Sequence, residues 1–216
     1  MEISFGPGGN GESWGRRKFP EQLPEYLSGL GLNGYEIECG RGVRLAEKTP
    51  ALLPGLAKEH GIYVTLHAPY FISLSSVEEE TRLKSVEYIF QSAQAAHSVG
   101  ARKIVVHSGS CSKMTREEAT ELAKDTLKKA QERLDSEGLS EIIICPETMG
   151  KVNQLGTLDE VLALCSVDER MIPCVDFGHL YARSQGTELN DETAPADYAA
   201  ILDAIAAALP GERAKK

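Results

Sequence analysis

Three histidines and two carboxylates follow apolar, strand-like runs in this sequence. They are His67 in VTLHAPY, His107 in IVVHSGS, Glu147 in IIICPET, and Asp176 with His179 in PCVDFGH. Neutral imidazoles and carboxylates bind zinc at about 2.0 to 2.2 Å, and a carboxylate can bridge two metal ions. The pattern therefore predicts a multinuclear site for zinc or another divalent metal, and Glu147 is the candidate catalytic residue.

A single histidine at the end of a strand is more often a hydrogen-bonded structural residue, but three at equivalent positions favour metal ligation. The other two histidines, His60 and His97, lie in the last turns of predicted helices, where the helix dipole accounts for them. Cys145 and Cys174 each precede a candidate ligand by two residues, and we interpret them as small core residues.

The elements that must position these residues alternate between strand and helix. The β-like runs are 2–5, 35–38, 62–66, 103–106, 141–145 and 172–175. Helices are predicted over 77–99 and 197–209, and after the capping boxes Thr115 with Glu118 and Thr157 with Glu160. Strict alternation predicts an α/β fold with a parallel sheet, either a doubly wound open sheet or a TIM (β/α)8 barrel with about six of its eight units present.

Length and composition restrict the class of protein further. The chain has 216 residues, 42% of them hydrophobic, which predicts a single barrel domain over residues 1–216, truncated before its last two units. Neither a membrane span nor a signal peptide is recognisable, and the five cysteines form no pattern of pairs, so we expect a cytoplasmic protein without disulfides. The net charge of −9 argues against non-specific attraction to nucleic acid. No glycine-rich fingerprint predicts a nucleotide cofactor.

A basic turn, GRGVR, follows Glu36 and Glu38 on the second predicted strand. Its two arginines, Arg41 and Arg44, are candidates for binding a substrate phosphate. A solvated basic turn is the alternative interpretation, and the sequence leaves both open.

Four motifs together resemble the endonuclease IV family (type 2 AP endonucleases) of the xylose isomerase-like TIM barrel superfamily. These motifs are HAPYFISL, VVHSGS, PETMGKVNQLGT and CVDFGHLYARSQG, in a match covering residues 63–186. The resemblance implies a barrel with up to three zinc ions that hydrolyses the phosphodiester 5′ to an abasic site in DNA. It also implies that His67, His107 and Glu147 hold one zinc, that Glu147 bridges to a second zinc with Asp176, and that His179 belongs to a third.

The sequence departs from the family in two respects. The family takes four further ligands from its seventh and eighth strands, which do not follow His179 here, and Ser108 stands where proline is usual. We therefore expect the chain as given to bind metal poorly and to catalyse little.

Two alternatives remain, a metal-dependent sugar isomerase or epimerase on the same barrel, and an inactive truncated barrel. The residues encoded beyond Lys216 would test the last of these. The oligomeric state is unknown.

Overall fold

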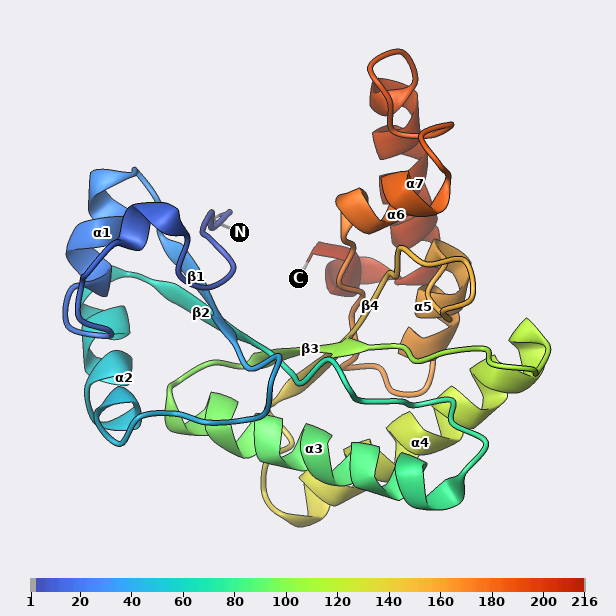
Figure 1. Cartoon of the computed structure of the whole chain (residues 1–216), viewed down its shortest axis with the longest axis horizontal. Helices are drawn as coiled ribbons and strands as arrows, with labels where there is room; N and C mark the ends of the chain where they lie inside the picture. Colours follow the sequence, from blue (N-terminus) through green and yellow to red (C-terminus); the bar gives the residue numbers. More distant parts are fainter. Residues whose placement is uncertain (1–2, 216) are drawn as a thin grey trace.

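The computed structural model describes residues 3–215, and the side chains of all of these except Glu212 and Lys215. Within this range four parallel strands form one sheet in the order β1-β2-β3-β4. The strands are β1 (Gly34–Glu38), β2 (Tyr63–His67), β3 (Lys103–His107) and β4 (Ile143–Glu147). The sheet is curved, and successive helices follow one another along its outer side (Figure 1).

The helices connect the strands in the alternating order that the sequence predicts. They are α1 (Leu23–Gly29), α2 (Lys48–His60), α3 (Glu79–Ser98), α4 (Arg116–Ser136), α5 (Leu158–Cys165), α6 (Phe177–Arg183) and α7 (Ala194–Ala208), with short 3-10 turns at Glu12–Trp14 and Gly211–Lys215. Both predicted capping boxes are formed, before α4 and before α5. No helix among the described residues is long and apolar enough to span a bilayer.

Apolar residues of the sheet and the outer helices form the core. Leu66, Ile104 and Ile144 of three neighbouring strands are fully buried, and so are Ile89 of α3 and Leu127 of α4. Alternate side chains of the strands pack against the helices, and those of the opposite face include the candidate ligands at the carboxyl ends of β2, β3 and β4. The helix-covered face thus fixes the position of the opposite face, on which the candidate ligands lie.

Two of the six predicted strands are wrong in their extent. Residues 3–5 of the run 2–5 lie in no strand; Glu2 is outside the described residues. The Phe5 carbonyl accepts from the amides of Asn33 and Gly34, and a single parallel bridge joins Gly8 to Glu36, so this segment lies beside β1 without forming a ladder. The run 172–175 contains Pro173, which has no N–H to donate to a ladder, and it makes one bridge, from Cys174 to Glu147.

Candidate metal centre

The candidate ligands lie at the carboxyl ends of neighbouring strands because the strand register puts them there. His67, His107 and Glu147 are each the last residue of their strand, so the strands extend one residue beyond the predicted runs at His67 and His107 and two residues beyond at Glu147. His107 lies opposite Glu147 in the β3–β4 pairing, and His67 lies opposite Val105, two residues before His107. Paired residues of parallel strands point to the same face, so the three side chains converge.

One oxygen of Glu147 meets both imidazoles. Glu147 Oε2 lies 3.3 Å from His67 Nε2 and 3.2 Å from His107 Nε2, and the two rings are perpendicular with centroids 5.1 Å apart. The Glu147 side chain is 6% exposed. The backbone carbonyl of Ala68 accepts from His67 Nδ1 at 2.8 Å, so in the neutral imidazole the lone pair available to a metal ion is on Nε2, on the side of the carboxylate.

The other oxygen of Glu147 faces a second group of ligands. Glu147 Oε1 lies 3.5 Å from His179 Nδ1, and Asp176 Oδ2 lies at the same distance from that nitrogen. His179 Nδ1 also donates to the Thr148 carbonyl at 2.8 Å. Glu147 thus belongs to both groups of potential ligand atoms, one with His67 and His107 and the other with Asp176 and His179.

Asp176 and His179 lie at the start of helix α6, which the sequence analysis did not predict. Asp176 is the N-cap residue, and its Oδ1 accepts from the His179 amide at 2.8 Å. The Asp-x-x-His spacing therefore has a local structural basis as a helix cap in addition to any role in metal binding. The signal that could have located the helix is this cap, directly after the run 172–175.

Hydrogen bonds between Glu147 and the two histidines shift the pKa values of Glu147 and His67. Burial raises the pKa of Glu147, but hydrogen bonds from His107 and His67 lower it further, to a net value of about 2. Burial lowers the pKa of His67, while its hydrogen bonds to Glu147 and Ala68 raise it to about 9. At neutral pH Glu147 is therefore ionised and His67 is protonated, and a metal ion that binds here must displace that proton.

A cleft of about 920 Å³ opens over the cluster. Besides the predicted ligands, its lining includes side chains that the sequence analysis did not assign to the site, namely Tyr70, Lys151 and Gln154. Glu36 and Glu38 of β1 also line it. Burial raises the pKa of Glu36, a shift that a hydrogen bond from Thr65 partly offsets.

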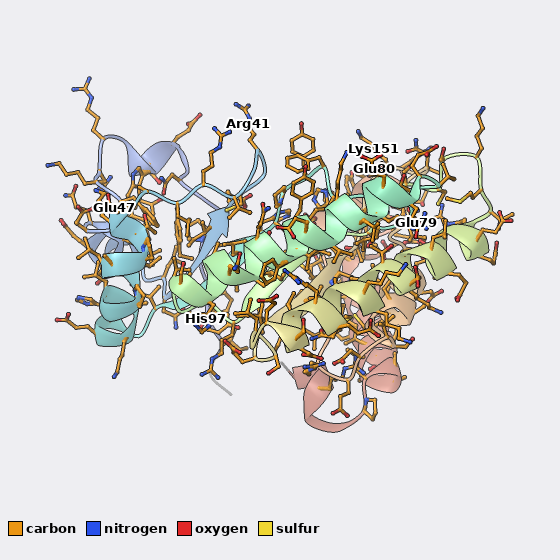
Figure 2. All side chains as sticks on the ribbon, turned by 90° about the horizontal axis from the view of Figure 1, so that it is seen from below. Arg41, Glu47, Glu79, Glu80, His97 and Lys151 are labelled. Carbon is orange, nitrogen blue, oxygen red and sulfur yellow. The ribbon has the colours of Figure 1, made fainter. Side chains whose placement is uncertain are left out.

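The two arginines of the basic turn do not line the cleft. Gly40 is the residue of that turn in the lining, whereas Arg41 and Arg44 are exposed beside it. Figure 2 shows Arg41 and Lys151 on the same side of the molecule and His97 on the opposite side. Neither arginine is thus among the residues that surround the candidate ligands.

Cys145 and the remaining two histidines lie where the sequence predicts, but Cys174, predicted as a small core residue, is only partly buried and lines the cleft. All five cysteines are free, and burial raises the pKa of Cys145 to about 12, so its thiol is protonated and a poor metal ligand. His60 and His97 are in the last turns of α2 and α3. His97 forms an exposed pair with Glu141, with 2.6 Å between Nδ1 and Oε1, far from the cleft.

A curved parallel sheet with helices outside and polar residues at its carboxyl ends defines a protein of the α/β-barrel class. Residues 24–208 match the model of the xylose isomerase-like TIM barrel family, and the chain belongs to that family. The barrel, not the doubly wound sheet, is thus the correct choice between the two predicted folds.

Among curated proteins, an uncharacterized protein of Methanocaldococcus jannaschii is 34% identical over 169 residues, covering 77% of this chain and 59% of the relative. A probable endonuclease 4 of Malacoplasma penetrans is 30% identical over 152 residues, covering 68% of this chain and 48% of the relative. The chain therefore spans about half to three fifths of the length of these relatives.

Solved structures show the same fold. Endonuclease IV from Thermus thermophilus superimposes with a TM-score of 0.65 at 24% identity, over 88% of this chain and 67% of the other. A D-tagatose 3-epimerase-like protein superimposes with a TM-score of 0.60 at 22% identity, over 72% of this chain and 60% of the other. At these levels of sequence identity, both matches show a shared fold and nothing further.

Proposed function

We propose that the protein is a zinc-dependent phosphodiester hydrolase that cleaves DNA on the 5′ side of abasic sites. The observation that carries the proposal is that Glu147 belongs to two groups of potential ligand atoms, one with His67 and His107 and the other with Asp176 and His179. A carboxylate shared in this way is suited to bridge two metal ions, the arrangement used for in-line displacement at phosphorus. The similarity to a probable endonuclease 4 points in the same direction.

The spacing of the donor atoms fits a zinc ion. Bonds of about 2.0 to 2.2 Å in a tetrahedral centre put neighbouring ligand atoms roughly 3.3 to 3.6 Å apart. Glu147 Oε2 lies 3.3 and 3.2 Å from the two imidazole nitrogens. His67, His107 and Glu147 would hold one ion, and Glu147, Asp176 and His179 would contribute to a second and third. Bound zinc would supply a hydroxide at neutral pH and a counter-charge for the phosphate.

Groups around the cleft suit a nucleic-acid substrate. Lys151 and Gln154 can contact phosphate oxygens from the loop after β4, and Arg41 and Arg44 can do so further out. Tyr70 lines the cleft and is 63% exposed, so its ring is available to stack on a base. These side chains would bind and orient the duplex while Glu147 keeps the ligand groups together.

The second candidate is a metal-dependent sugar isomerase or epimerase. The observation in its favour is that Glu36 and Glu38 line the same cleft as the histidines and enrich it in carboxylates. A D-tagatose 3-epimerase-like protein also has the same architecture. We favour the nuclease because two histidines from separate strands meet one glutamate.

The test is a nicking assay on duplex DNA carrying one abasic-site analogue, with zinc-loaded protein expressed from the gene through its natural stop codon, because we expect the chain as given to catalyse little. We expect zinc-dependent cleavage on the 5′ side of the analogue, lost in His107→Ala and retained in His97→Ala, a matched histidine outside the cleft. A folded, zinc-bound protein that leaves the duplex intact would contradict the nuclease proposal. Turnover of a ketose in its place would support the sugar alternative.

A further inference from the structure

Two fully buried hydroxyls follow two of the candidate ligands directly in sequence. Ser108 follows His107 and Thr148 follows Glu147, and both residues are 0% exposed. Ser108 Oγ donates to the Glu147 carbonyl at 2.9 Å, across the β3–β4 pair. The Ser108 hydroxyl thus connects the end of β3, which carries His107, to the backbone of Glu147.

Thr148 directs every polar group it has to the segment that carries the second ligand group. Its amide donates to the Cys174 carbonyl at 3.0 Å, and its carbonyl accepts from His179 Nδ1 at 2.8 Å. Its Oγ1 accepts from the Asp176 amide at 2.9 Å and donates to the Asp176 carbonyl at 3.2 Å. One side chain therefore satisfies both backbone groups of Asp176.

These contacts matter because little of the sheet holds that segment. The run 172–175 makes one bridge to β4, at Cys174, so there is no extended ladder to fix Asp176 and His179 relative to Glu147 within the described residues. The hydroxyl is costly to remove, because the Asp176 amide would be left without its acceptor, whereas the Asp176 carbonyl also accepts from the Leu180 amide at 3.1 Å. The hydrogen bonds of Thr148 therefore hold Asp176 and His179 in place where a strand ladder does not.

We propose that Thr148 is a positioning residue that sets the distance between the two ligand groups, and that Ser108 does the same between His107 and Glu147. The inference rests on the metal site of the proposed function. Groups that orient metal ligands typically change metal affinity about 10- to 100-fold when removed. Loss of the Thr148 hydroxyl should therefore weaken the group of Glu147, Asp176 and His179 and spare the group of His67 and His107.

The test compares Thr148→Val, which keeps the shape but removes the hydroxyl, with Thr148→Ser, which restores it. Ser92→Ala is the control, since Ser92 is also 0% exposed but donates to Tyr88 within α3. Each protein is titrated with Co²⁺ alone, followed by its visible absorption. We expect two binding events in the wild type, with the weaker one reduced about 10- to 100-fold in Thr148→Val, rescued in Thr148→Ser and unchanged in Ser92→Ala.

Amide hydrogen exchange on the metal-free proteins provides the second readout. The Asp176 and His179 amides should exchange faster in Thr148→Val than in the wild type, while amides of α3 should not change. Two unaltered Co²⁺ events in a folded Thr148→Val would overturn the inference, and so would a wild type that binds no Co²⁺. The wild type could bind Co²⁺ in two events, with the weaker event reduced in Thr148→Val, and still nick no DNA. That result would support the positioning role of Thr148 and contradict only the nuclease proposal.

Discussion

At the scale of single residues, chemical type and strand position were enough to find the candidate ligands. His67, His107 and Glu147 converge because they share one edge of a parallel sheet, a property that a sequence reveals directly. The residues that support them could not be found in this way. Thr148 and Gly150 act on Asp176 and His179, which are more than 25 positions away, and only the folded chain brings them together.

Gly150 gives a test of how closely the second ligand group is packed. A Cβ added there would lie 3.2 Å from His179 Cδ2 and 3.4 Å from His179 Cα, tighter than side chains normally pack. We expect Gly150→Ala to displace the imidazole and to weaken Co²⁺ binding by the second group about tenfold, the lower end of the range for groups that orient metal ligands. Titration with Co²⁺ measures this.

The matched control is Gly55→Ala in the interior of α2, where an added Cβ meets nothing within 4 Å. Alanine favours a helix by up to about 1 kcal/mol over glycine. Gly55→Ala should therefore raise the melting temperature slightly and leave both Co²⁺ events unchanged. Equal Co²⁺ binding by the two variants would show that His179 has room to move.

At the scale of elements, long amphipathic segments and caps were predictable and short strands were not. The segment predicted as a helix over 77–99 is α3, and both Thr-x-x-Glu capping boxes form. α7 begins three residues before the predicted 197, with Pro195 in its first turn. The failures are the runs 2–5 and 172–175, which form no ladder, and the helices α1 and α6, whose seven residues each are too few to show a helical period.

The loop between β4 and α5 is held by charged groups from three helices. Arg183 of α6 donates to the carbonyls of Met149, Lys151 and Gln154, and Arg116 of α4 donates to those of Val152 and Gln154. Glu160 accepts from Arg116 at 2.7 Å and from two amides of the loop. This network fixes the loop that presents Gly150 and Lys151 to the cleft.

The Glu160 network makes a prediction about acid stability. Burial raises the pKa of Glu160, but the Arg116 guanidinium and the two loop amides lower it further, to about 2. A carboxyl with a lowered pKa stabilises the fold above its ordinary value of about 4.3, and that contribution is lost as the pH falls toward 2. Glu160→Gln should lower the free energy of unfolding at pH 7 by on the order of 2 kcal/mol and flatten its fall between pH 4.5 and 2.

Urea unfolding of the metal-free protein at several pH values measures this. Glu118→Gln is the control, since Glu118 has the same place in the capping box of α4 but is exposed. Glutamine also serves in a capping box, so this variant should change stability by less than about 0.5 kcal/mol at any pH. Parallel pH profiles for the wild type and Glu160→Gln would exclude Glu160 as the source of the acid sensitivity.

At the scale of the whole molecule, the alternation of strands and helices predicted a parallel α/β fold and the family resemblance selected the barrel, but composition gave little information about the substrate. A net charge of −9 repels a polyanion at long range, so affinity for DNA must come from local cations near the cleft and from the bound metal. Lys151 lines the cleft, and Arg41 lies exposed on the same side of the molecule. A neutral sugar would need neither of them.

The dependence of binding on salt therefore distinguishes the two candidate substrates. Each phosphate contact adds about one to the slope of log affinity against log salt concentration. For a DNA substrate, Lys151→Gln should weaken binding and reduce that slope by about one, while Lys128→Gln on the outer helix α4 should change neither. Fluorescence anisotropy with a labelled abasic duplex between about 50 and 200 mM salt, the range over which such contacts cost most affinity, measures both quantities. A slope that is equal in all three proteins would mean that no phosphate is bound at Lys151, and the carboxylate-rich side of the cleft, with Glu36 and Glu38, would then define the substrate.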